Sequence, residues 1–328
     1  MSKKILLVGC GQLGSRHLQA LATLDDVSQI DIVDKNAESL EVGKSRLKET
    51  MGVNGQILLN WLTDLKKASG QGDLCLMATQ SPGRCRLIKE ITNDLGYRNF
   101  LIEKIVSQSV EEYEDLLKFC KEKKLSVWVN CKTRAYRIHQ YIKSKLNPKE
   151  PILFSAVGGN HGLGNNGVHE VDLFVFHDGA KNLYPTGSYT DSVLHPSKRG
   201  ADIFDLSGTL FGYSDKGSQF TVSFAGGHTA SDHISIVSPR CRFFVDHLQK
   251  FALESYAETN WQWGQIPLEE NIMVSHMTKV FVSDIFQKGQ CQLPTLKECF
   301  LAHEFILKTL LPHFNRLRYA QSEFCPIT

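Results

Sequence analysis

A glycine motif directly follows the first apolar segment of the chain. The apolar run Ile5–Val8 leads into the motif Gly9-Cys10-Gly11-Gln12-Leu13-Gly14, which has the spacing G-x-G-x-x-G. A helix-compatible stretch continues to about Leu24, and a second expected strand, Ile30-Asp31-Ile32-Val33, ends at Asp34, twenty residues beyond Gly14. Strand, glycine turn, helix, strand and acid in this order are typical of a βαβ unit that binds a dinucleotide. This order constrains the first part of the chain to a Rossmann-type sheet.

Each position of the motif has a physical role in such a site. Gly9 permits the tight turn, Gly11 lets the backbone approach a pyrophosphate, and Gly14 allows close packing of helix on strand. Gln12 and Leu13 complete the loop, and the helix that follows offers free N–H groups to the phosphates. The Asp34 carboxylate can accept hydrogen bonds from ribose hydroxyls and would repel a 2′-phosphate. We therefore expect NAD as cofactor, with NADP as the alternative because Lys35 lies beside Asp34.

Composition excludes several classes of function. A net charge of +2 gives no reason to expect nucleic acid as a partner. We also expect no membrane contact, because no apolar run approaches the roughly 18 residues of a membrane span. The nine cysteines include no C-x-x-C pair, which favours reduced thiols and a cytoplasmic location.

The pattern of apolar segments predicts two domains. Residues 1–130 alternate short strands with helices, as in a doubly wound parallel sheet; the further strands expected there are 74–78, 100–102 and 126–129, and the helices 37–49, 82–96 and 109–124. A bridging helix at about 135–147 leads into an α+β domain over 131–328 with an open, mostly antiparallel sheet. Its expected elements are a strand at 152–157, a helix at 169–177, a meander with strands 210–213, 220–224, 234–237 and 242–245, and helices at 268–288 and 295–311.

The expected meander is strongly apolar. Its apolar side chains include Leu210, Phe211, Phe220, Val222 and Phe224. One interpretation is that they form the interface of a homo-oligomer, a dimer or tetramer built through the open sheet. The other is that all of them face covering helices.

Two candidate catalytic residues follow from position and chemistry. Lys104, with Glu103, comes directly after the strand 100–102, at the sheet edge where open α/β sheets bind ligands. There its ammonium can hydrogen-bond a substrate oxygen. His169 lies near the start of the helix 169–177, and an imidazole can take the proton of an alcohol as hydride leaves its carbon.

Polar residues surround His169 in the sequence. Asn165 lies four residues before it and Asp172 three after, so either shares a helical face with it if the helix extends that far. Asn160, His161 and Asn166 add hydrogen-bonding groups that suit a polyhydroxylated ligand. His169-Glu170 begins like the zinc motif H-E-x-x-H, but position 173 is Leu. We therefore expect no metal.

The chain resembles the glucose–fructose oxidoreductase / inositol dehydrogenase family (Gfo/Idh/MocA) over nearly its whole length. The matching segments, in family order, are the glycine motif, Asp34, Ala78-Thr79, Arg84, Leu101-Ile102-Glu103-Lys104, Arg134 and Gly167-Val168-His169-Glu170-Val171-Asp172. The resemblance implies that Ala78, Thr79 and Glu103 contact the cofactor, that Lys104 contacts substrate and nicotinamide, and that His169 is the catalytic acid/base.

The chain departs from the family's pattern at two positions. Asn165 stands where many polyol dehydrogenases of the family have an aspartate, and an amide cannot take a proton. Ile105 replaces the proline of the E-K-P signature, whose peptide bond is often cis. Because a cis bond before a non-proline residue costs roughly 3–4 kcal/mol, we expect a trans bond and a slightly shifted Lys104.

The resemblance implies an NAD(P)-dependent dehydrogenase or reductase that acts on a secondary alcohol or ketone of a sugar, a polyol or a sugar derivative. Arg134 and the segment Lys198-Arg199-Gly200 are candidates for binding a phosphate or carboxylate, which suits a nucleotide-linked or acidic sugar. The alternative hypothesis is a non-catalytic NAD(P)-binding sensor or scaffold, motivated by Asn165 and Ile105. A methyltransferase is a third hypothesis, because Asp34 also suits adenosine, but Lys104 does not fit it.

Overall fold

The structure is a computed structural model that describes residues 2–159 and 162–328. The chain divides into two compact units. The first comprises Met1–Ser107, Glu112–Asn130 and Asn271–Lys297. The second comprises Gln108–Glu111, Cys131–Glu270 and Glu298–Thr328.

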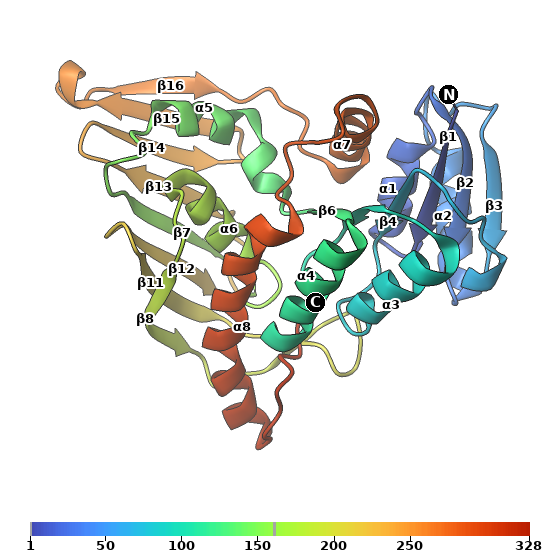
Figure 1. The fold of residues 1–328 in the computed structure, drawn as a ribbon. Coiled ribbons are helices and arrows are strands. Elements are labelled where there is room, and N and C mark those ends of the chain that lie inside the picture. The colour runs from blue at the N-terminus through green and yellow to red at the C-terminus, as the bar shows by residue number, and fades with distance from the viewer. Residues whose placement is uncertain (1, 160–161) are drawn as a thin grey trace. The chain divides into compact units, whose positions relative to one another are not determined.

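The first unit is built on a six-stranded parallel sheet with the order β3-β2-β1-β4-β5-β6 (Figure 1). Its strands are β1 (Lys3–Val8), β2 (Val27–Val33), β3 (Leu58–Leu62), β4 (Leu74–Met77), β5 (Asn99–Ile102) and β6 (Ser126–Val129). The chain winds outward from β1 in one direction and, after crossing to β4, in the other. This is the doubly wound order, and the expected Rossmann sheet is confirmed. β3 is an edge strand that the sequence pattern did not predict.

Helices flank this sheet, and one of them comes from far along the chain. The helices of the first half are α1 (Gly14–Leu21), α2 (Ala37–Lys48), α3 (Arg84–Glu90), which continues as a π-helical turn over Ile91–Leu95, and α4 (Val110–Lys123). The distant helix α7 (Val274–Lys288) belongs to the same unit and packs against α1. It buries Met277, Phe281 and Ile285, and Lys279 Nζ donates to Thr23 O at 2.9 Å.

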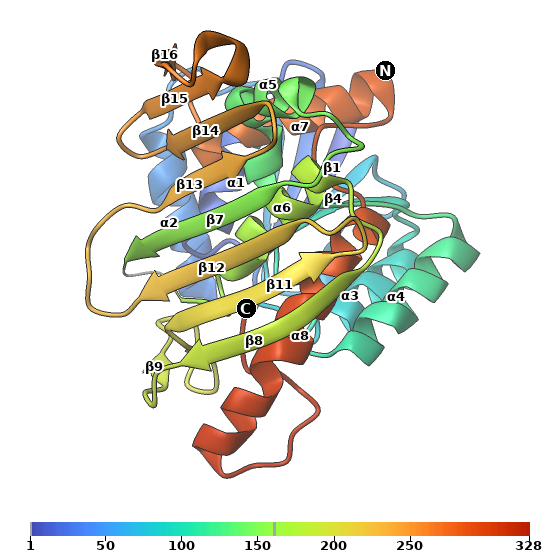
Figure 2. The same cartoon turned by 90° about the vertical axis from the view of Figure 1, so that its left-hand side faces the viewer.

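The second unit contains an open eight-stranded sheet with the order β16-β15-β14-β13-β7-β12-β11-β8 (Figure 2). Its strands are β7 (Leu153–Gly159), β8 (Leu183–Thr190), β11 (Gly208–Ser214), β12 (Gln219–Ala225), β13 (His233–Val237), β14 (Cys241–Asp246), β15 (Phe251–Tyr256) and β16 (Trp263–Pro267). A separate two-stranded pair joins β9 (His195–Pro196) to β10 (Phe204–Asp205).

The expected open, mostly antiparallel sheet is confirmed, but the expected continuous meander is wrong. β7 lies between β12 and β13 and pairs parallel with β12 and antiparallel with β13. The two predicted hairpins, β11–β12 and β13–β14, are therefore separated by a strand that precedes both in sequence. β8, β15 and β16 extend the sheet beyond the predicted strands.

Helices cover one face of this sheet (Figures 1 and 2). They are α5 (Arg137–Lys145), α6 (Gly167–Asp178) and α8 (Leu296–Arg318). Phe220 shows how the layers join, because its ring lies 4.5 Å from that of Phe174 on α6 and 4.9 Å from that of Phe305 on α8. Of the apolar residues singled out in the sequence, those buried are Leu210, Phe220, Val222 and Phe224.

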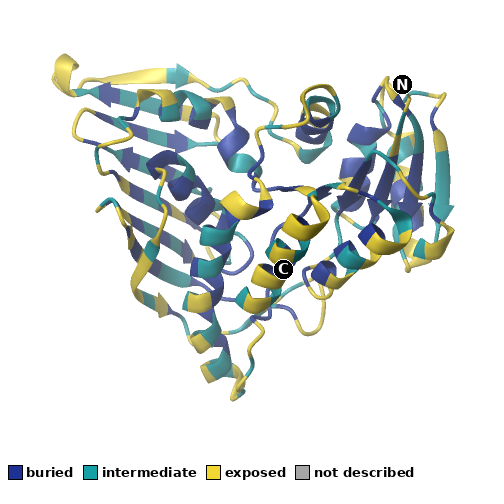
Figure 3. Cartoon of the chain, in the orientation of Figure 1, coloured by how far each residue is buried: buried dark blue, intermediate teal, exposed yellow. Residues whose placement is uncertain are grey.

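The burial of side chains alternates along these strands (Figure 3). Phe211 is 41% exposed, and it shares an uncovered face with other large apolar side chains. These are Leu153, Val157, Tyr189 and Tyr213. Among the helices of the described residues, none is long and apolar enough to cross a bilayer.

Candidate functional site

The glycine turn adopts the geometry that its spacing predicts. Gly9 has φ +88°, and its N–H donates to Val33 O at 2.8 Å, so the turn leaves β1 beside the end of β2. A Cβ on Gly14 would lie only 1.9 Å from Gly9 O, which explains why no side chain fits there. A Cβ on Gly11 would instead meet Ser39 Oγ at 3.9 Å. Gly11 therefore leaves room for a ligand to approach the backbone at the start of α1.

An arginine from α2 fixes the same loop. Arg46 Nη1 donates to Gln12 O at 2.5 Å and to Ser15 Oγ at 2.6 Å, and Arg46 Nη2 donates to Gln12 Oε1. This guanidinium adds positive charge beside the glycine turn, where an anion would bind. Arg46 was not predicted from the sequence, because no local motif distinguishes it from the other basic residues of its helix.

Asp34 is held against the glycine turn by two backbone groups. Its Oδ2 accepts the N–H of Cys10 at 2.8 Å, and its Oδ1 accepts the N–H of Asn36 at 2.9 Å. The carboxylate therefore has a fixed position at the carboxyl end of β2, while each oxygen retains a further lone pair. Cys10 is a packing residue, because burial, with the charge of Asp34, raises the pKa of its thiol to about 12.

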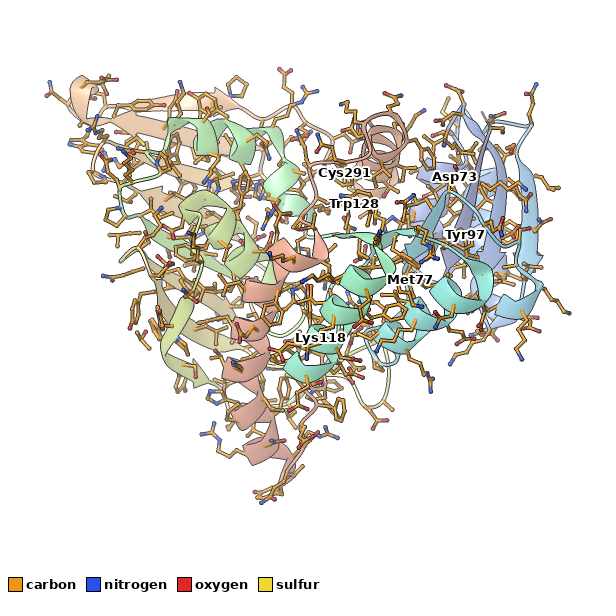
Figure 4. All side chains as sticks on the ribbon, in the orientation of Figure 1. Asp73, Met77, Tyr97, Lys118, Trp128 and Cys291 are labelled. Atoms are coloured by element: carbon orange, nitrogen blue, oxygen red, sulfur yellow. The ribbon has the colours of Figure 1, made fainter. Side chains whose placement is uncertain are left out.

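Ala78 and Thr79 adjoin the glycine turn at the carboxyl end of β4. Val8 pairs with Met77, so β1 and β4 end at the same level of the sheet. A Cβ on Gly9 would lie 3.0 Å from both Ala78 C and Thr79 N. Met77, labelled in Figure 4, is the last residue of β4. The glycine turn, Asp34, Ala78 and Thr79 are thus brought together at one edge of the sheet.

Glu103 lies in a buried hydrogen-bond network at that edge. Its Oε1 lies 3.0 Å from His17 Nε2 on α1 and 2.5 Å from Asn130 Nδ2 after β6. Because a carboxylate only accepts, Nε2 of His17 is the donor, and Nδ1 faces Thr278 Oγ1 of α7 at 2.8 Å. Burial acts to raise the pKa of Glu103, but the bonds from His17 and Asn130 outweigh it and hold the pKa at about 2.

The peptide bond that follows Lys104 corrects an expectation from the sequence. The bond between Lys104 and Ile105 is cis, whereas we expected trans. Arg84 accounts for the local conformation, since its Nη1 donates to Glu103 O at 2.5 Å and also to Ile105 O. A buried guanidinium therefore binds the carbonyls on both sides of Lys104, a tertiary contact that a local sequence argument does not include.

In the second unit, a polar loop leads into α6. Asp205 fixes this loop by accepting the N–H of Gly164 at 2.7 Å and that of Asn165 at 3.2 Å. Asn165 Oδ1 accepts the N–H of Thr328 at 3.0 Å. The side chain that we expected to contact substrate therefore binds the protein's own backbone. Asn166 is the N-cap of α6. Asn160 and His161, which we expected to contribute hydrogen-bonding groups, lie outside the described residues.

His169 and Glu170 occupy the first turn of α6. His169 is the third residue of the helix and half-buried, and its N–H donates to Asn166 O at 2.9 Å. Glu170 is 5% exposed. Burial, followed by the charges of Asp232 and Asp172, raises the pKa of the Glu170 carboxyl to about 8. A carboxyl that is protonated near neutral pH is a candidate proton donor. Glu170 was not predicted from the sequence, because its burial depends on the fold.

Arg134 and Asp172 bind each other. Arg134 Nε donates to Asp172 Oδ2 at 2.8 Å and Nη2 donates to Oδ1 at 2.5 Å, in a buried bidentate pair. The guanidinium also lies over the ring of Phe176, 5.3 Å from its centroid. Both residues were expected to contact substrate, and the structure shows that each neutralises the charge of the other.

Comparisons with known proteins support the fold. No family model matches the sequence, and no curated protein matches it. Solved structures that match over nearly the whole chain include UDP-N-acetylglucosamine 3-dehydrogenase GnnA from Acidithiobacillus ferrooxidans (15% identity, 98% of each chain covered, TM-score 0.71). Another is an oxidoreductase from Agrobacterium radiobacter in complex with NAD+, L-tartaric acid and magnesium (13% identity, 96% of this chain and 97% of that chain, TM-score 0.76).

A third similar structure is a variant of a 3-ketoreductase from Actinomadura kijaniata in complex with TDP-benzene and NADP. It is 14% identical, the match covers 95% of this chain and 98% of that chain, and the TM-score is 0.71. These matches confirm the fold class: a parallel Rossmann-like sheet joined to a mostly antiparallel mixed sheet.

Proposed function

We propose that this protein is an NAD(P)-dependent oxidoreductase that transfers hydride between nicotinamide and a secondary alcohol or ketone of a sugar, polyol or sugar derivative. The observation that carries the proposal is the glycine turn with Asp34 anchored to it through the N–H of Cys10. The similar structures support it, because two of them hold NAD+ or NADP and they include a nucleotide-sugar 3-dehydrogenase and a 3-ketoreductase.

The residues of the first unit fit a dinucleotide. The backbone at Gly11 leaves space for a pyrophosphate, and Arg46 supplies positive charge beside it. Asp34 accepts from ribose hydroxyls, which favours NAD over NADP. Gln12, Leu13, Ala78 and Thr79 complete the cofactor-binding set, and Glu103 fixes the end of β5. When bound, the nicotinamide supplies the hydride acceptor or donor.

The chain's own catalytic groups are Lys104 and His169. The Lys104 ammonium hydrogen-bonds the reacting oxygen of the substrate and stabilises negative charge there. His169 takes the proton of the alcohol during oxidation and returns it during reduction. The pair Arg134–Asp172 positions α6, on which His169 lies, and Asn165 and Asn166 hold the loop before it.

A nucleotide-linked sugar is the substrate class that we favour. The support is that a UDP-N-acetylglucosamine 3-dehydrogenase and a 3-ketoreductase holding TDP-benzene share this fold. A 3-hydroxyl or 3-keto group is accordingly the first reacting position to test.

We also propose a homo-oligomer, a dimer or tetramer, that associates through the uncovered face of the eight-stranded sheet. Exposed apolar side chains on one sheet face, Leu153, Phe211 and Tyr213 among them, favour association. A cytoplasmic location is part of the same proposal, and the lack of disulfide bonds among the cysteines of the described residues supports it.

The first experiment is a thermal-shift titration of the purified chain with NADH and NADPH at matched concentrations. A ligand at 100 times its Kd adds about 2.7 kcal/mol of apparent stability, which gives a clear rise in Tm. We expect a larger shift with NADH. No shift with either nucleotide, together with no nucleotide released when the protein is denatured, would contradict the proposal.

A substitution then separates binding from turnover. Lys104→Met is expected to abolish oxidation of a sugar and nucleotide-sugar panel while NADH still raises Tm. Lys118→Met is the matched control, because Lys118 is an exposed lysine of α4 (Figure 4). If the wild-type chain binds NADH but turns over no compound of the panel, the non-catalytic sensor or scaffold becomes the better hypothesis.

A further inference from the structure

A cluster of metal-ligating side chains is buried in the second unit. Cys131, Asp172 and Cys299 each present one ligand atom, and these atoms all lie within 4.8 Å of one another. The two sulfur atoms are 3.3 Å apart, although the residues are separated by 168 positions in the chain. All three residues are at most 1% exposed. The cofactor and substrate roles proposed above use neither thiol.

A histidine lies beside this cluster on the same helix as Cys299. His303 is four residues further along α8, so the two side chains share one face of the helix. Its Nδ1 lies 3.4 Å from Cys299 Sγ and 2.9 Å from the carbonyl oxygen of Cys299. Because a carbonyl only accepts, Nδ1 carries the proton, and this imidazole is a neighbour of the cluster and not one of its ligands. Two thiols and one carboxylate therefore converge from three places: the residue before the short helical turn Lys132–Ala135, α6 and α8.

The spacing of the sulfur atoms suits a tetrahedral ion. Bonds of about 2.3 Å to each sulfur imply a sulfur–sulfur separation of about 3.8 Å. The two sulfur atoms are 3.3 Å apart in the structure, and the carboxylate oxygen of Asp172 lies within 4.8 Å of both. A change of about 0.5 Å in the sulfur–sulfur separation would match the pair to the ion.

The charges also balance. Two thiolates and the Asp172 carboxylate carry three negative charges, and a divalent cation together with the Arg134 guanidinium carries three positive charges. Arg134 already donates to both oxygens of Asp172. In metal sites, ligating carboxylates are commonly oriented by such outer hydrogen-bond donors.

We propose that Cys131, Asp172 and Cys299 bind one divalent cation of the zinc class. Thiolate ligands select zinc-like ions over magnesium or calcium. Binding replaces the protons of the two thiols, so that one cation enters and two protons leave. With three protein ligands the fourth position is left to water, and the ion ties α6 and α8 to the segment that begins at Cys131.

Cobalt substitution tests this directly, without any nicotinamide nucleotide. The full chain is produced in medium containing Co²⁺ in place of Zn²⁺, and its metal content and absorption spectrum are measured. We expect one equivalent of cobalt per chain, a thiolate-to-cobalt charge-transfer band in the near ultraviolet and intense visible bands of tetrahedral Co²⁺. Zinc-grown protein should contain one equivalent of zinc.

Variants assign the ligands. Cys299→Ser is expected to lose the charge-transfer band and most of the bound cobalt. Cys325→Ser is the matched control, because Cys325 is an equally buried thiol of the same unit. If the variant fails to fold, X-ray absorption of the wild-type zinc protein decides the question by counting two sulfur ligands at about 2.3 Å. Absence of stoichiometric metal, or an unchanged spectrum in Cys299→Ser, would overturn the proposal.

Discussion

Three histidines of the second unit, two of them buried, form a chain that predicts a strong dependence of stability on pH. His139 Nδ1 lies 3.1 Å from His177 Nε2, and His139 Nε2 lies 2.9 Å from His247 Nε2. His139 is 0% and His177 2% exposed. A chain of imidazoles this close accepts additional protons poorly, because each new charge is desolvated and repelled by its neighbours.

His177 gives the magnitude of the effect. Burial, followed by repulsion from Lys143 and Arg134, lowers the pKa of His177 from 6.5 to about 3. Below pH 6.5 the unfolded chain therefore binds a proton that the folded chain excludes. As the pH is lowered from 6.5 toward 3, the free energy of unfolding falls by about 1.4 kcal/mol for each pH unit. Stability from this residue is complete above pH 6.5 and is lost as the pH falls toward 3.

The substitution His177→Gln removes this proton linkage. Urea unfolding, followed by far-ultraviolet circular dichroism at several pH values from 7 to 4.5, gives the slope of the free energy against pH. We expect the slope of the variant to be smaller than that of the wild type by up to about 1.4 kcal/mol per pH unit. The slope of the free energy against pH is the decisive quantity, because any substitution among these three histidines also lowers stability at pH 7.

An exposed histidine provides the control. His228 lies in the loop after β12 and is exposed, so His228→Gln should leave the slope unchanged. If His177→Gln retains the wild-type slope, His177 does not titrate as its burial predicts, and the account of the histidine chain is refuted.

Two further predictions concern the first unit. Gly14→Ala should lower the free energy of unfolding by about 1–3 kcal/mol and remove the NADH-induced rise in Tm, because the new Cβ would lie 1.9 Å from Gly9 O; an unaltered Tm shift with NADH would contradict this. Glu103→Gln should cost about 2 kcal/mol in urea unfolding at pH 7, because it removes the charge that accepts from His17 and Asn130. The exposed Glu114→Gln is its control, and equal stability of the two variants would show that the network contributes little.

The sequence predicted those parts of the fold that local patterns determine. The glycine turn was recognised because each of its glycines meets a local steric requirement. β6 was found although it is an edge strand, because three of its four residues are buried apolar side chains. The strands that escaped prediction include β3, β8 and β16, which are edge strands of their sheets. An edge strand buries fewer side chains than a central one, so its sequence carries a weaker apolar pattern.

Only those residues of the candidate site that directly follow a strand in the sequence could be predicted. Asp34 follows its strand at the expected distance, and Lys104 follows β5, so both could be named. Asp205, which fixes the loop before α6, contacts backbone groups 40 and 41 residues away. The raised pKa of Glu170 and the cis bond after Lys104 likewise depend on groups brought together by folding. Local propensity contains no information on such contacts.

The network around Glu103 shows what these distant contacts achieve. His17 lies on the helix that begins at the glycine turn, Glu103 ends the strand that carries Lys104, and Asn130 follows β6. Two bonds to one carboxylate oxygen therefore fix the spacing between the proposed pyrophosphate site and the proposed catalytic lysine. Thr278 extends the same network to α7 through His17 Nδ1. The helix α7, which begins at residue 274, is thus a structural support of the first unit. A substitution at Thr278 should therefore weaken the proposed binding of NADH, as a smaller NADH-induced rise in Tm.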